Sequence, residues 1–176
     1  DVRIKRWRLE RLTSQPNFSF QNTDVCDRAA LRSLFTEDSP REVVHLGARA
    51  GVQASVSDPW TYYETNVLGT LNTLELCREL GVEKFILAST SSVYGADTLR
   101  PFREDSDTSR PLSPYAASKK AAETLVYAYH HLHGLDTTVL RYFTVYGPAG
   151  RPDMSIFRFV RAIAEGEPIT VTGDGR

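Results

Sequence analysis

The stretch Lys84-Phe-Ile-Leu-Ala-Ser-Thr90 decides the fold of this chain. Its first half is a continuous apolar run, which is typical of a strand buried on both faces of a parallel sheet. A loop rich in Asp, Arg and Pro follows, and Ser113-Pro114 then begins the longest predicted helix, which ends at Gly134. Residues 137–145 return to a strand pattern, so this part of the chain predicts a strand, a helix and a second strand in that order.

The same alternation extends toward both ends of the chain. Besides the elements above, we predict helices at residues 1–14, from a cap at Asp27 to about residue 35 and at 59–80, strands at 18–24 and 43–46, and, after Gly147, a helix at 155–165 and a short strand at 169–171. Alternating strands and helices imply right-handed crossovers and a mainly parallel sheet covered on both faces. The expected fold class is therefore α/β, a doubly wound parallel sheet.

Size, charge and cysteine content narrow the class of protein. The chain has 176 residues, enough for a domain with a substantial core, and a formal net charge of −1. Its mixed charges predict no surface for nucleic acid or an anionic membrane, and no apolar run reaches the roughly 18 residues that span a bilayer. The first residues lack a signal-peptide pattern. We expect Cys26 and Cys77 to be reduced thiols in a soluble cytoplasmic protein that binds no metal.

Tyr115 and Lys119 are the first candidates for chemistry. They lie four residues apart, so a helix that begins at Ser113-Pro114 places both side chains on one face. The lysine ammonium and the positive end of the helix dipole both favour the phenolate form of the tyrosine, which can then exchange protons near neutral pH. By itself the spacing is a weak signal and is more typical of a solvated contact on a helix surface. The catalytic hypothesis therefore depends on the surrounding motifs.

Hydroxyl side chains follow the strand that ends at Thr90. The carboxyl ends of strands in an open α/β sheet deliver residues to ligands, so Thr90, Ser91 and Ser92 are candidates to bind a substrate oxygen. A turn that merely caps the strand is the alternative. Three ordered motifs favour the ligand site: Ala88-Ser-Thr-Ser-Ser-Val-Tyr-Gly95, Ser113-Pro-Tyr-Ala-Ala-Ser-Lys119 and Leu140-Arg-Tyr-Phe-Thr-Val-Tyr-Gly-Pro148.

These motifs resemble those of the extended short-chain dehydrogenase/reductase family, whose NAD-dependent epimerases and dehydratases act on nucleotide sugars with a Rossmann domain. The resemblance covers essentially the whole chain. Residues 45–56, 63–70 and 150–154 look most like UDP-glucuronate 4-epimerases. Family members are often dimers through a four-helix contact, so the resemblance also implies a homodimer that uses the helices at 59–80 and 113–133.

The resemblance implies a role for each matching residue. Tyr115 would be the catalytic base and acid, Lys119 its cationic partner and a ligand of the nicotinamide ribose, and Thr90 the hydroxyl that shares the sugar 4-oxygen. The implied NAD contacts are Asp24, Val25, Leu46, Gly47, Ala48, Tyr115, Lys119, Tyr142 and Phe143. The implied substrate contacts are Thr90, Ser91, Ser92, Thr144 and Arg151. For Arg151 a surface arginine is the alternative, and Asn66 is expected to tie loop backbones together beside the site.

The chain departs from the family pattern near its two ends. A dinucleotide site of this fold normally begins with a strand, a Gly-rich turn and a helix that holds the pyrophosphate. No glycine precedes Gly47, so residues 1–46 contain no such turn. We therefore expect residues 1–148 to form a partial dinucleotide-binding Rossmann domain without its first strand and Gly-rich turn, and residues 149–176 to begin a substrate-binding region. A chain truncated in this way at both ends is expected to be inactive alone.

The reaction expected of the intact protein is NAD-dependent 4-epimerisation of a UDP-sugar through a 4-keto intermediate. The best match is UDP-glucuronate to UDP-galacturonate. Other nucleotide-sugar epimerases, dehydratases and decarboxylases use the same Tyr/Lys pair and are alternatives, although a dehydratase would want carboxylates where this chain has Ser91 and Ser92. A non-catalytic fragment or a dinucleotide-binding scaffold is the alternative from a different class.

Overall fold

The computed structural model describes residues 2–96 and 100–171, and the chain divides into two compact units. The larger unit spans Gln21–Phe143. The smaller unit combines the residues up to Phe20 with those from Thr144 onward. Within the described residues, every strand belongs to the larger unit.

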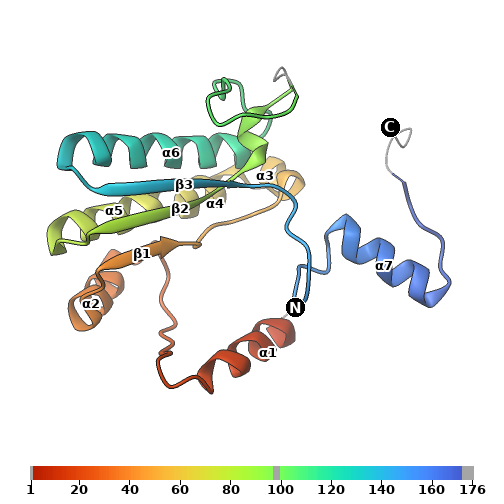
Figure 1. Ribbon diagram of the computed structural model, residues 1–176, viewed down its shortest axis with the longest axis horizontal. Coiled ribbons are helices and arrows are strands. Elements are labelled where there is room, and N and C mark those ends of the chain that lie inside the picture. Colours follow the sequence, from red (N-terminus) through yellow and green to blue (C-terminus); the bar gives the residue numbers. More distant parts are fainter. Residues whose placement is uncertain (1, 97–99, 172–176) are drawn as a thin grey trace. The chain divides into compact units, whose positions relative to one another are not determined.

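The larger unit is built on a parallel sheet with helices packed along it (Figure 1). Its elements, in chain order, are α2 (Arg28–Asp38), β1 (Glu42–His45), α3 (Val52–Ser57), α4 (Pro59–Tyr63), a π-helical turn (Glu64–Leu68), α5 (Gly69–Leu80), β2 (Lys84–Thr90), a 3-10 turn (Ser91–Tyr94), α6 (Pro114–His133) and β3 (Asp136–Tyr142). The strand order is β1-β2-β3, and both pairs are parallel. The α/β class and the parallel sheet predicted from the sequence are confirmed.

The register of the sheet brings the carboxyl ends of its strands to one edge. His45 at the end of β1 pairs with Leu87, and Thr90 at the end of β2 pairs with Tyr142 at the end of β3. The strands predicted at 43–46 and 84–90 are confirmed. The third predicted strand is also present, but it ends at Tyr142 rather than at Val145.

The core lies between β2 and the helices α5 and α6. Phe85 and Leu87 of β2 are fully buried, whereas Ile86 and Ala88 on the opposite face are half-buried, so the burial predicted for both faces is complete on one face only. The remaining members of the buried cluster are Leu31, Phe35, Leu74, Leu76, Cys77, Val82, Ala122, Val126 and Leu135. Each large apolar side chain buried in this way stabilises the fold by about 1.5–3 kcal/mol. Cys77 is a free buried thiol, and Cys26 is a free, half-buried one.

Capping residues explain where α6 begins and ends and where α2 begins. The Ser113 hydroxyl accepts a hydrogen bond from the Ala116 N–H at 3.1 Å, and Pro114 occupies the first helical position. At the other end, Gly134 has a φ of 69°, a conformation that glycine adopts without strain. The Asp27 carboxylate accepts from the Ala30 N–H at the start of α2. The helix starts and ends predicted at these residues are confirmed.

Two predicted strands are wrong. Residues 18–24 alternate apolar and polar side chains, and residues 169–171 form a short apolar run, but neither segment is a strand. A strand requires a hydrogen-bonded neighbour, and no described strand pairs with either segment. The local pattern is therefore present without the tertiary pairing that would make it a strand.

The helix predicted over residues 59–80 is interrupted. It forms as α4 and α5 with the π-helical turn Glu64–Leu68 between them, and α3 precedes it as a short helix that was not expected from the sequence. The extra residue of a π turn rotates the following side chains relative to a regular helix. Here the turn directs Asn66 into the interior, where it is fully buried.

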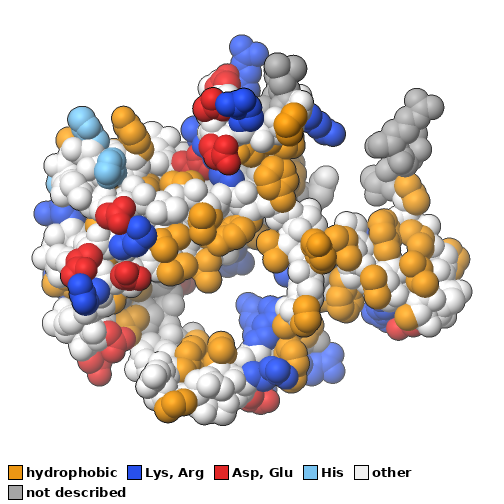
Figure 2. All heavy atoms as spheres, in the orientation of Figure 1, with side chains coloured by type: hydrophobic (Ala, Val, Ile, Leu, Met, Phe, Trp, Pro, Cys, Tyr) orange, Lys and Arg blue, Asp and Glu red, His pale blue; other side chains and the backbone are white. Residues whose placement is uncertain are grey.

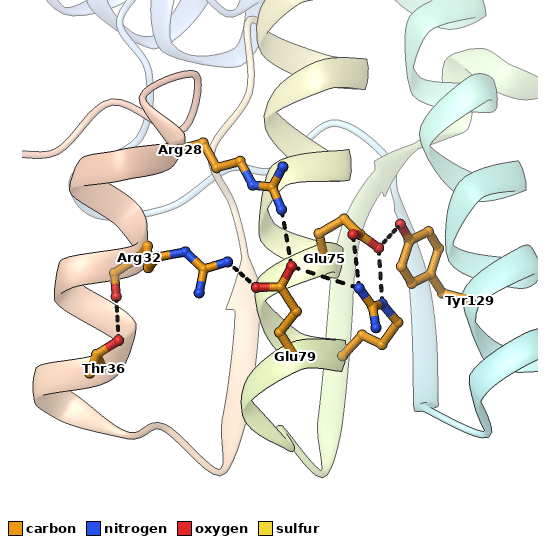
Figure 3. A network of polar contacts seen from close by, with 7 residues as sticks. Arg28, Arg32, Thr36, Glu75, Glu79 and Tyr129 are labelled. Carbon is orange, nitrogen blue, oxygen red and sulfur yellow. Dashed lines mark hydrogen bonds and ion pairs between the residues drawn. The ribbon is translucent and has the colours of Figure 1, made fainter.

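An ion-pair network joins α2, α5 and α6 on the outside of the larger unit (Figure 3). Glu79 of α5 pairs with Arg28 and Arg32 of α2. One turn earlier, Glu75 accepts hydrogen bonds from Arg78 and from the Tyr129 hydroxyl of α6. These hydrogen bonds hold the pKa of Glu75 at about 2. The network fastens three helices to one another through α5.

The smaller unit contains α1 (Val2–Thr13) and α7 (Ser155–Glu165), both at positions predicted as helices. Residue 1 of the first predicted helix lies outside the described residues. The Arg8 guanidinium donates to the carbonyl oxygens of Ala149 and Gly150, which joins the two ends of the chain within this unit. Across the described parts of the chain, no helix has the length and apolar character needed to cross a membrane.

Apolar side chains gather over the strands of the larger unit (Figure 2). Val44 and Leu46 are 55% and 65% exposed, and Tyr142 is 43% exposed. Helices cover the other side of the sheet through α5 and α6, whereas these side chains are left open to solvent. Val44 and Tyr142 belong to β1 and β3, and Leu46 directly follows β1. The faces of parallel strands are normally both covered.

Val25 fits against two glycines, and this close approach explains why they are glycines. A Cβ atom at Gly69 would lie 2.7 Å from Val25 Cγ2, and one at Gly47 would lie 2.9 Å from Val25 Cγ1. Val25 is β-branched and has little rotamer freedom to move away. Packing of the segment before α2 against α5 therefore requires a missing side chain at Gly69.

Replacing Gly69 tests this packing. Alanine is intrinsically favoured over glycine in a helix by about 1 kcal/mol, but we expect Gly69→Ala to destabilise the protein because its methyl group overlaps Val25. The double variant Gly69→Ala/Val25→Ala should recover stability, with a coupling energy of about 1 kcal/mol or more in urea unfolding. Additive effects of the two substitutions would contradict the close approach.

Candidate functional site

The predicted site residues of the larger unit lie around the carboxyl ends of its three strands. Thr90 ends β2, Tyr142 ends β3, and the two are paired in the sheet. Leu46, Gly47 and Ala48 directly follow β1, Ser91 and Ser92 form the turn after β2, and Phe143 directly follows β3. Parallel pairing therefore brings together residues that are far apart in the sequence.

The first turn of α6 carries Tyr115 beside this edge. α6 packs against both β2 and the 3-10 turn that begins at Ser91. Tyr115 is half-buried, and its ring meets the ring of Tyr62 edge to face with centroids 6.1 Å apart. Tyr62 is itself fixed because its hydroxyl donates to the Ala50 carbonyl oxygen at 3.0 Å. Tyr115 thus sits in a supported position with part of its surface open.

Thr90 is almost completely buried at 7% exposure. Its hydroxyl oxygen accepts a hydrogen bond from the Ser92 N–H at 3.2 Å, which starts the 3-10 turn. The capping role considered as the alternative is therefore present. It does not exclude a ligand role, because a hydroxyl that accepts one hydrogen bond still has a proton to donate and a second lone pair.

Lys119 is a buried cation, with only 2% of its surface exposed. Burial disfavours the charged form and lowers the pKa of Lys119 to about 8, against the opposing attraction of Glu123. His45, at the end of β1, has its pKa lowered to about 4, first by burial and then by the charge of Lys119. An ammonium in this setting is a concentrated, poorly hydrated charge that costs folding stability.

Asn66 holds the loop after β1 against α6. Its Oδ1 accepts from the Arg49 N–H at 2.7 Å, and its Nδ2 donates to the Arg49 carbonyl oxygen at 3.1 Å and to Ser118 Oγ at 2.9 Å. The Ser118 hydroxyl in turn donates to the carbonyl oxygen of Tyr115. The predicted structural role of Asn66 is confirmed, and its hydrogen bonds reach the first turn of α6.

The predicted adenine-side residues form a turn that α5 supports. Asp24 accepts from the Cys26 N–H at 2.9 Å, and the amide of Asn72 donates to the carbonyl oxygens of Val25 and Cys26. Because Val25 also contacts Gly47, the turn lies directly beside the loop that follows β1. The structure thus brings Asp24 and Val25 to the same end of the sheet as the other candidates.

Thr144 and Arg151 belong to the smaller unit. Arg151 is about half exposed and pairs with the carboxylate of Asp153, from its Nε to Oδ1 at 3.1 Å. Their assignment to the substrate stays a prediction.

Three further polar residues beside the site were not identified from the sequence. Glu123, buried on α6, accepts hydrogen bonds from Arg141 of β3 and from Ser89 of β2. The signals were a carboxylate four residues after Lys119 and an arginine inside a predicted strand. Neither signal identifies the ion pair, because Glu123 and Arg141 are 18 positions apart.

A cavity of about 800 Å³ opens between α6, β3 and the 3-10 turn. Its walls include the stacked rings of Tyr94 and Phe102, whose centroids are 4.8 Å apart, and the ring of Phe143. Arg141 and Glu123 lie on its charged side. Of the predicted site residues only Tyr142 and Phe143 line this cavity, so it is not centred on Tyr115 and Lys119.

These features define a class of protein: an α/β fold whose parallel strands end beside a helix that carries a Tyr-x-x-x-Lys pair. The model of the NAD dependent epimerase/dehydratase family matches residues 3–176. The chain belongs to this family.

The chain is similar in sequence to UDP-glucuronate 4-epimerases. It is 55% identical to a UDP-glucuronate 4-epimerase of Thermodesulfobacterium geofontis over 99% of this chain and 54% of that protein. A probable UDP-glucuronate 4-epimerase of Rhizobium meliloti is 42% identical over all of this chain and 52% of its own length.

The fold is likewise similar to that of a UDP-glucuronic acid 4-epimerase from Bacillus cereus, solved in complex with UDP-glucuronic acid and NAD. The TM-score is 0.90 at 36% identity, over 99% of this chain and 54% of the other. A dTDP-glucose 4,6-dehydratase from Streptomyces venezuelae with NAD bound gives a TM-score of 0.86 at 31% identity, over 97% of this chain and 52% of the other. The chain therefore spans about half the length of the proteins that it matches.

Lys119→Met tests the cost of the buried charge. Between pH 8 and 10.5 Lys119 is protonated in the unfolded chain but not in the folded chain, so the free energy of unfolding rises with pH in this range. The destabilisation by the buried charge is therefore complete below pH 8 and decreases above it. We expect Lys119→Met to raise the free energy of unfolding at pH 7 by about 2–3 kcal/mol, and the gain to disappear toward pH 10.5. Lys120→Met, at the partly exposed neighbouring position, is the control and should change stability little. A Lys119→Met variant less stable than the wild type at pH 7 would contradict the assignment.

Proposed function

We propose that this chain carries the proton-transfer half of a UDP-glucuronate 4-epimerase, which interconverts UDP-glucuronate and UDP-galacturonate in the intact protein. The observation that supports the proposal best is the half-buried Tyr115 four residues before the buried Lys119, at the carboxyl end of the strand that terminates in Thr90. The 55% identity to a UDP-glucuronate 4-epimerase supports the choice of reaction.

Three side chains carry out the proton chemistry in this proposal. The Tyr115 oxygen takes the proton of the sugar 4-hydroxyl and later returns a proton to the same oxygen. The Lys119 ammonium stabilises the phenolate that this exchange requires. The Thr90 hydroxyl hydrogen-bonds the 4-oxygen and holds it beside Tyr115. The intermediate is a 4-keto sugar, which gains its new configuration when hydrogen returns to the opposite face of C4.

The residues present fit the nicotinamide end of NAD. Gly47 directly follows β1 and has no room for a side chain, because a Cβ atom would meet Val25. Leu46, Ala48, Tyr142 and Phe143 would hold the cofactor through apolar contacts, Lys119 would bind its ribose, and Asp24 and Val25 would contact its adenine. Bound NAD supplies a hydride acceptor and donor for C4 of the sugar. Residues 1–46 contain no glycine, so a Gly-rich turn for the pyrophosphate is not among them.

The substrate side of the proposal rests on hydroxyl and guanidinium groups. Ser91 and Ser92 lie against the sugar, and the absence of carboxylates at these two positions disfavours a dehydratase, which needs an acid and a base there. Thr144 and Arg151 contribute from the substrate side, with the substrate-binding region beginning at residue 149, and a guanidinium there suits a carboxylate or a phosphate. The active form is a homodimer, and the partial Rossmann domain comprises residues 1–148.

Tyr115→Phe in the intact protein tests the central role. Because the variant keeps the ring and loses only the proton-carrying oxygen, we expect kcat for UDP-glucuronate epimerisation to fall by about 10²–10⁴-fold, with the fold unchanged by circular dichroism. Tyr127→Phe is the matched control, since Tyr127 lies on the same helix and is 69% exposed. Near-normal turnover in Tyr115→Phe would refute the proposal.

A comparison of substrates tests the choice of sugar. If Arg151 faces the hexuronate carboxylate, kcat/KM should be higher for UDP-glucuronate than for UDP-glucose by about tenfold or more. Arg151→Gln should narrow this ratio by lowering kcat/KM for UDP-glucuronate alone. Equal values for the two sugars in the wild type would favour a neutral-sugar epimerase, and a 4-keto-6-deoxy product would identify a dehydratase.

A further inference from the structure

A buried ion pair connects the catalytic helix of the proposed site to two strands. The two carboxylate oxygens of Glu123 on α6 each accept a hydrogen bond from Arg141 on β3, both at 3.0 Å. Oε1 also accepts from the Ser89 hydroxyl of β2 at 2.5 Å. Glu123 and Ser89 are each 6% exposed, and the Arg141 side chain, which lines the cavity beside α6, is 19% exposed, so the carboxylate itself is largely buried. Charge-assisted bidentate pairs of this kind are strong and fix relative orientation.

The location of the cluster links it to the proposed chemistry. Ser89 and Arg141 are partners in the sheet register, and each lies one residue before a strand end, at Thr90 and Tyr142 respectively. Glu123 lies four residues after Lys119, one helical turn farther along the same face of α6. The ion pair therefore joins α6 to β2 and β3 immediately behind the residues proposed to meet the sugar and the nicotinamide.

Arg141 is itself held from several sides. Its guanidinium lies over the ring of Tyr94, 5.1 Å from the centroid, and its Nη1 donates to the Glu104 carbonyl oxygen at 3.1 Å. Hydrogen bonding to Glu123 raises the pKa of Arg141 further, so its charge is permanent. Lys120 adds a second, more distant cation at 3.7 Å from Glu123 Oε2. The carboxylate is thus held in place by these partners.

We propose that Glu123 is a positioning residue for the Tyr115–Lys119 pair. Its carboxylate accepts hydrogen bonds from Arg141 and Ser89 and so fixes the position of α6 relative to the carboxyl ends of β2 and β3. The same carboxylate supplies the negative charge that keeps the buried Lys119 ammonium protonated. This role rests on the proposed function, because it acts through the side chains assigned to proton transfer.

The charges around Lys119 determine how Glu123 affects its protonation. The groups that face Lys119 or adjoin it are His45 from β1, Tyr115 and Glu123 from α6, Tyr62 from α4 through its contact with Tyr115, and Arg141 from β3 through Glu123. Glu123 is the group that raises the pKa of Lys119, against the larger lowering by burial. His45 is neutral near pH 7, because burial holds its pKa at about 4. Without Glu123, Lys119 would lose its proton at a lower pH.

Glu123→Gln in the protein tests the electrostatic part directly. The chain contains four lysines, so selective ¹³C labelling and a Cε titration by NMR, assigned with Lys119→Met, isolate Lys119. We expect the Lys119 titration to move to lower pH by roughly one unit in Glu123→Gln. In the intact enzyme, the alkaline limb of the kcat profile for UDP-glucuronate should move in the same direction, and kcat at pH 8 should fall by about fivefold.

Two further variants separate this role from simple stabilisation. Glu123→Gln leaves Arg141 without its partner, so Glu123→Gln/Arg141→Met removes both charges and keeps the fold if the single variant unfolds. The double variant should also titrate at Lys119 below the wild type, but by less than Glu123→Gln, because loss of the Arg141 cation raises the pKa of Lys119 again. Glu79→Gln is the matched control: Glu79 is also a helix carboxylate paired with arginines, namely Arg28, Arg32 and Arg78, but on the outer surface of α2 and α5 (Figure 3). It should change neither the Lys119 titration nor the alkaline limb.

The outcomes distinguish this inference from the proposed function. If folded Glu123→Gln, or the double variant, titrates at Lys119 like the wild type, the inference is overturned even where the enzyme is active. If the wild type epimerises UDP-glucuronate and the alkaline limb is unchanged in the variants, the inference is likewise overturned and the proposed function stands. If the wild type has no activity on nucleotide sugars, the proposed function fails, while a shifted Lys119 titration still supports the electrostatic coupling.

Discussion

The parallel pairing of β2 with a strand on each side is the constraint on which the rest of the structure depends. β2 pairs with β1 along its first four residues and with β3 along its whole length. Because all three strands run in the same direction, their carboxyl ends meet at one edge, and the loops that follow them are forced into proximity. The buried residues Phe85 and Leu87 secure β2 against α5 and α6. Every candidate residue of the larger unit derives its place from this arrangement.

The buried face of α6 shows how much folding stability the proposed site gives up. A helix that packs on a sheet usually buries apolar side chains, and α6 does so at Ala122 and Val126. Near its first turns it instead buries Ser118, Lys119 and Glu123. Ser118 and Glu123 have partners from other elements, because an unpaired polar group in the interior is costly. Stability is lost at this end of the helix, which is the end that carries the proposed proton-transfer residues.

Asn66 and Glu123 provide hydrogen-bond partners for buried polar groups at two successive turns of α6. Asn66 connects the loop after β1 to Ser118, and Glu123 connects β2 and β3 to the turn after Lys119. Tyr115 and Lys119 therefore lie between two sets of buried hydrogen bonds. Side chains held in this way keep their geometry without relying on bound ligand, which is what preorganised chemistry requires.

Much of the framework was predictable from the sequence, because the signals concerned are local. The apolar run at 84–90 identified a buried strand, and Ser113-Pro114 and Gly134 identified the ends of α6. The four-residue spacing of Tyr115 and Lys119 was enough to place both on one helix face. The strands predicted at 18–24 and 169–171 were wrong, because alternation records a side-chain pattern and not the neighbouring strand that a sheet requires.

The sequence by itself determined the helix, its caps, the buried strand and the pair of residues one turn apart, since each depends on neighbours within a few positions. Only the tertiary structure decided that Lys119 is buried, that Glu123 meets Arg141 and Ser89, and that Val25 fits against Gly47 and Gly69. Such contacts join residues separated by 18 to more than 40 positions. They arise from sheet register and helix packing, which no single segment of the chain encodes.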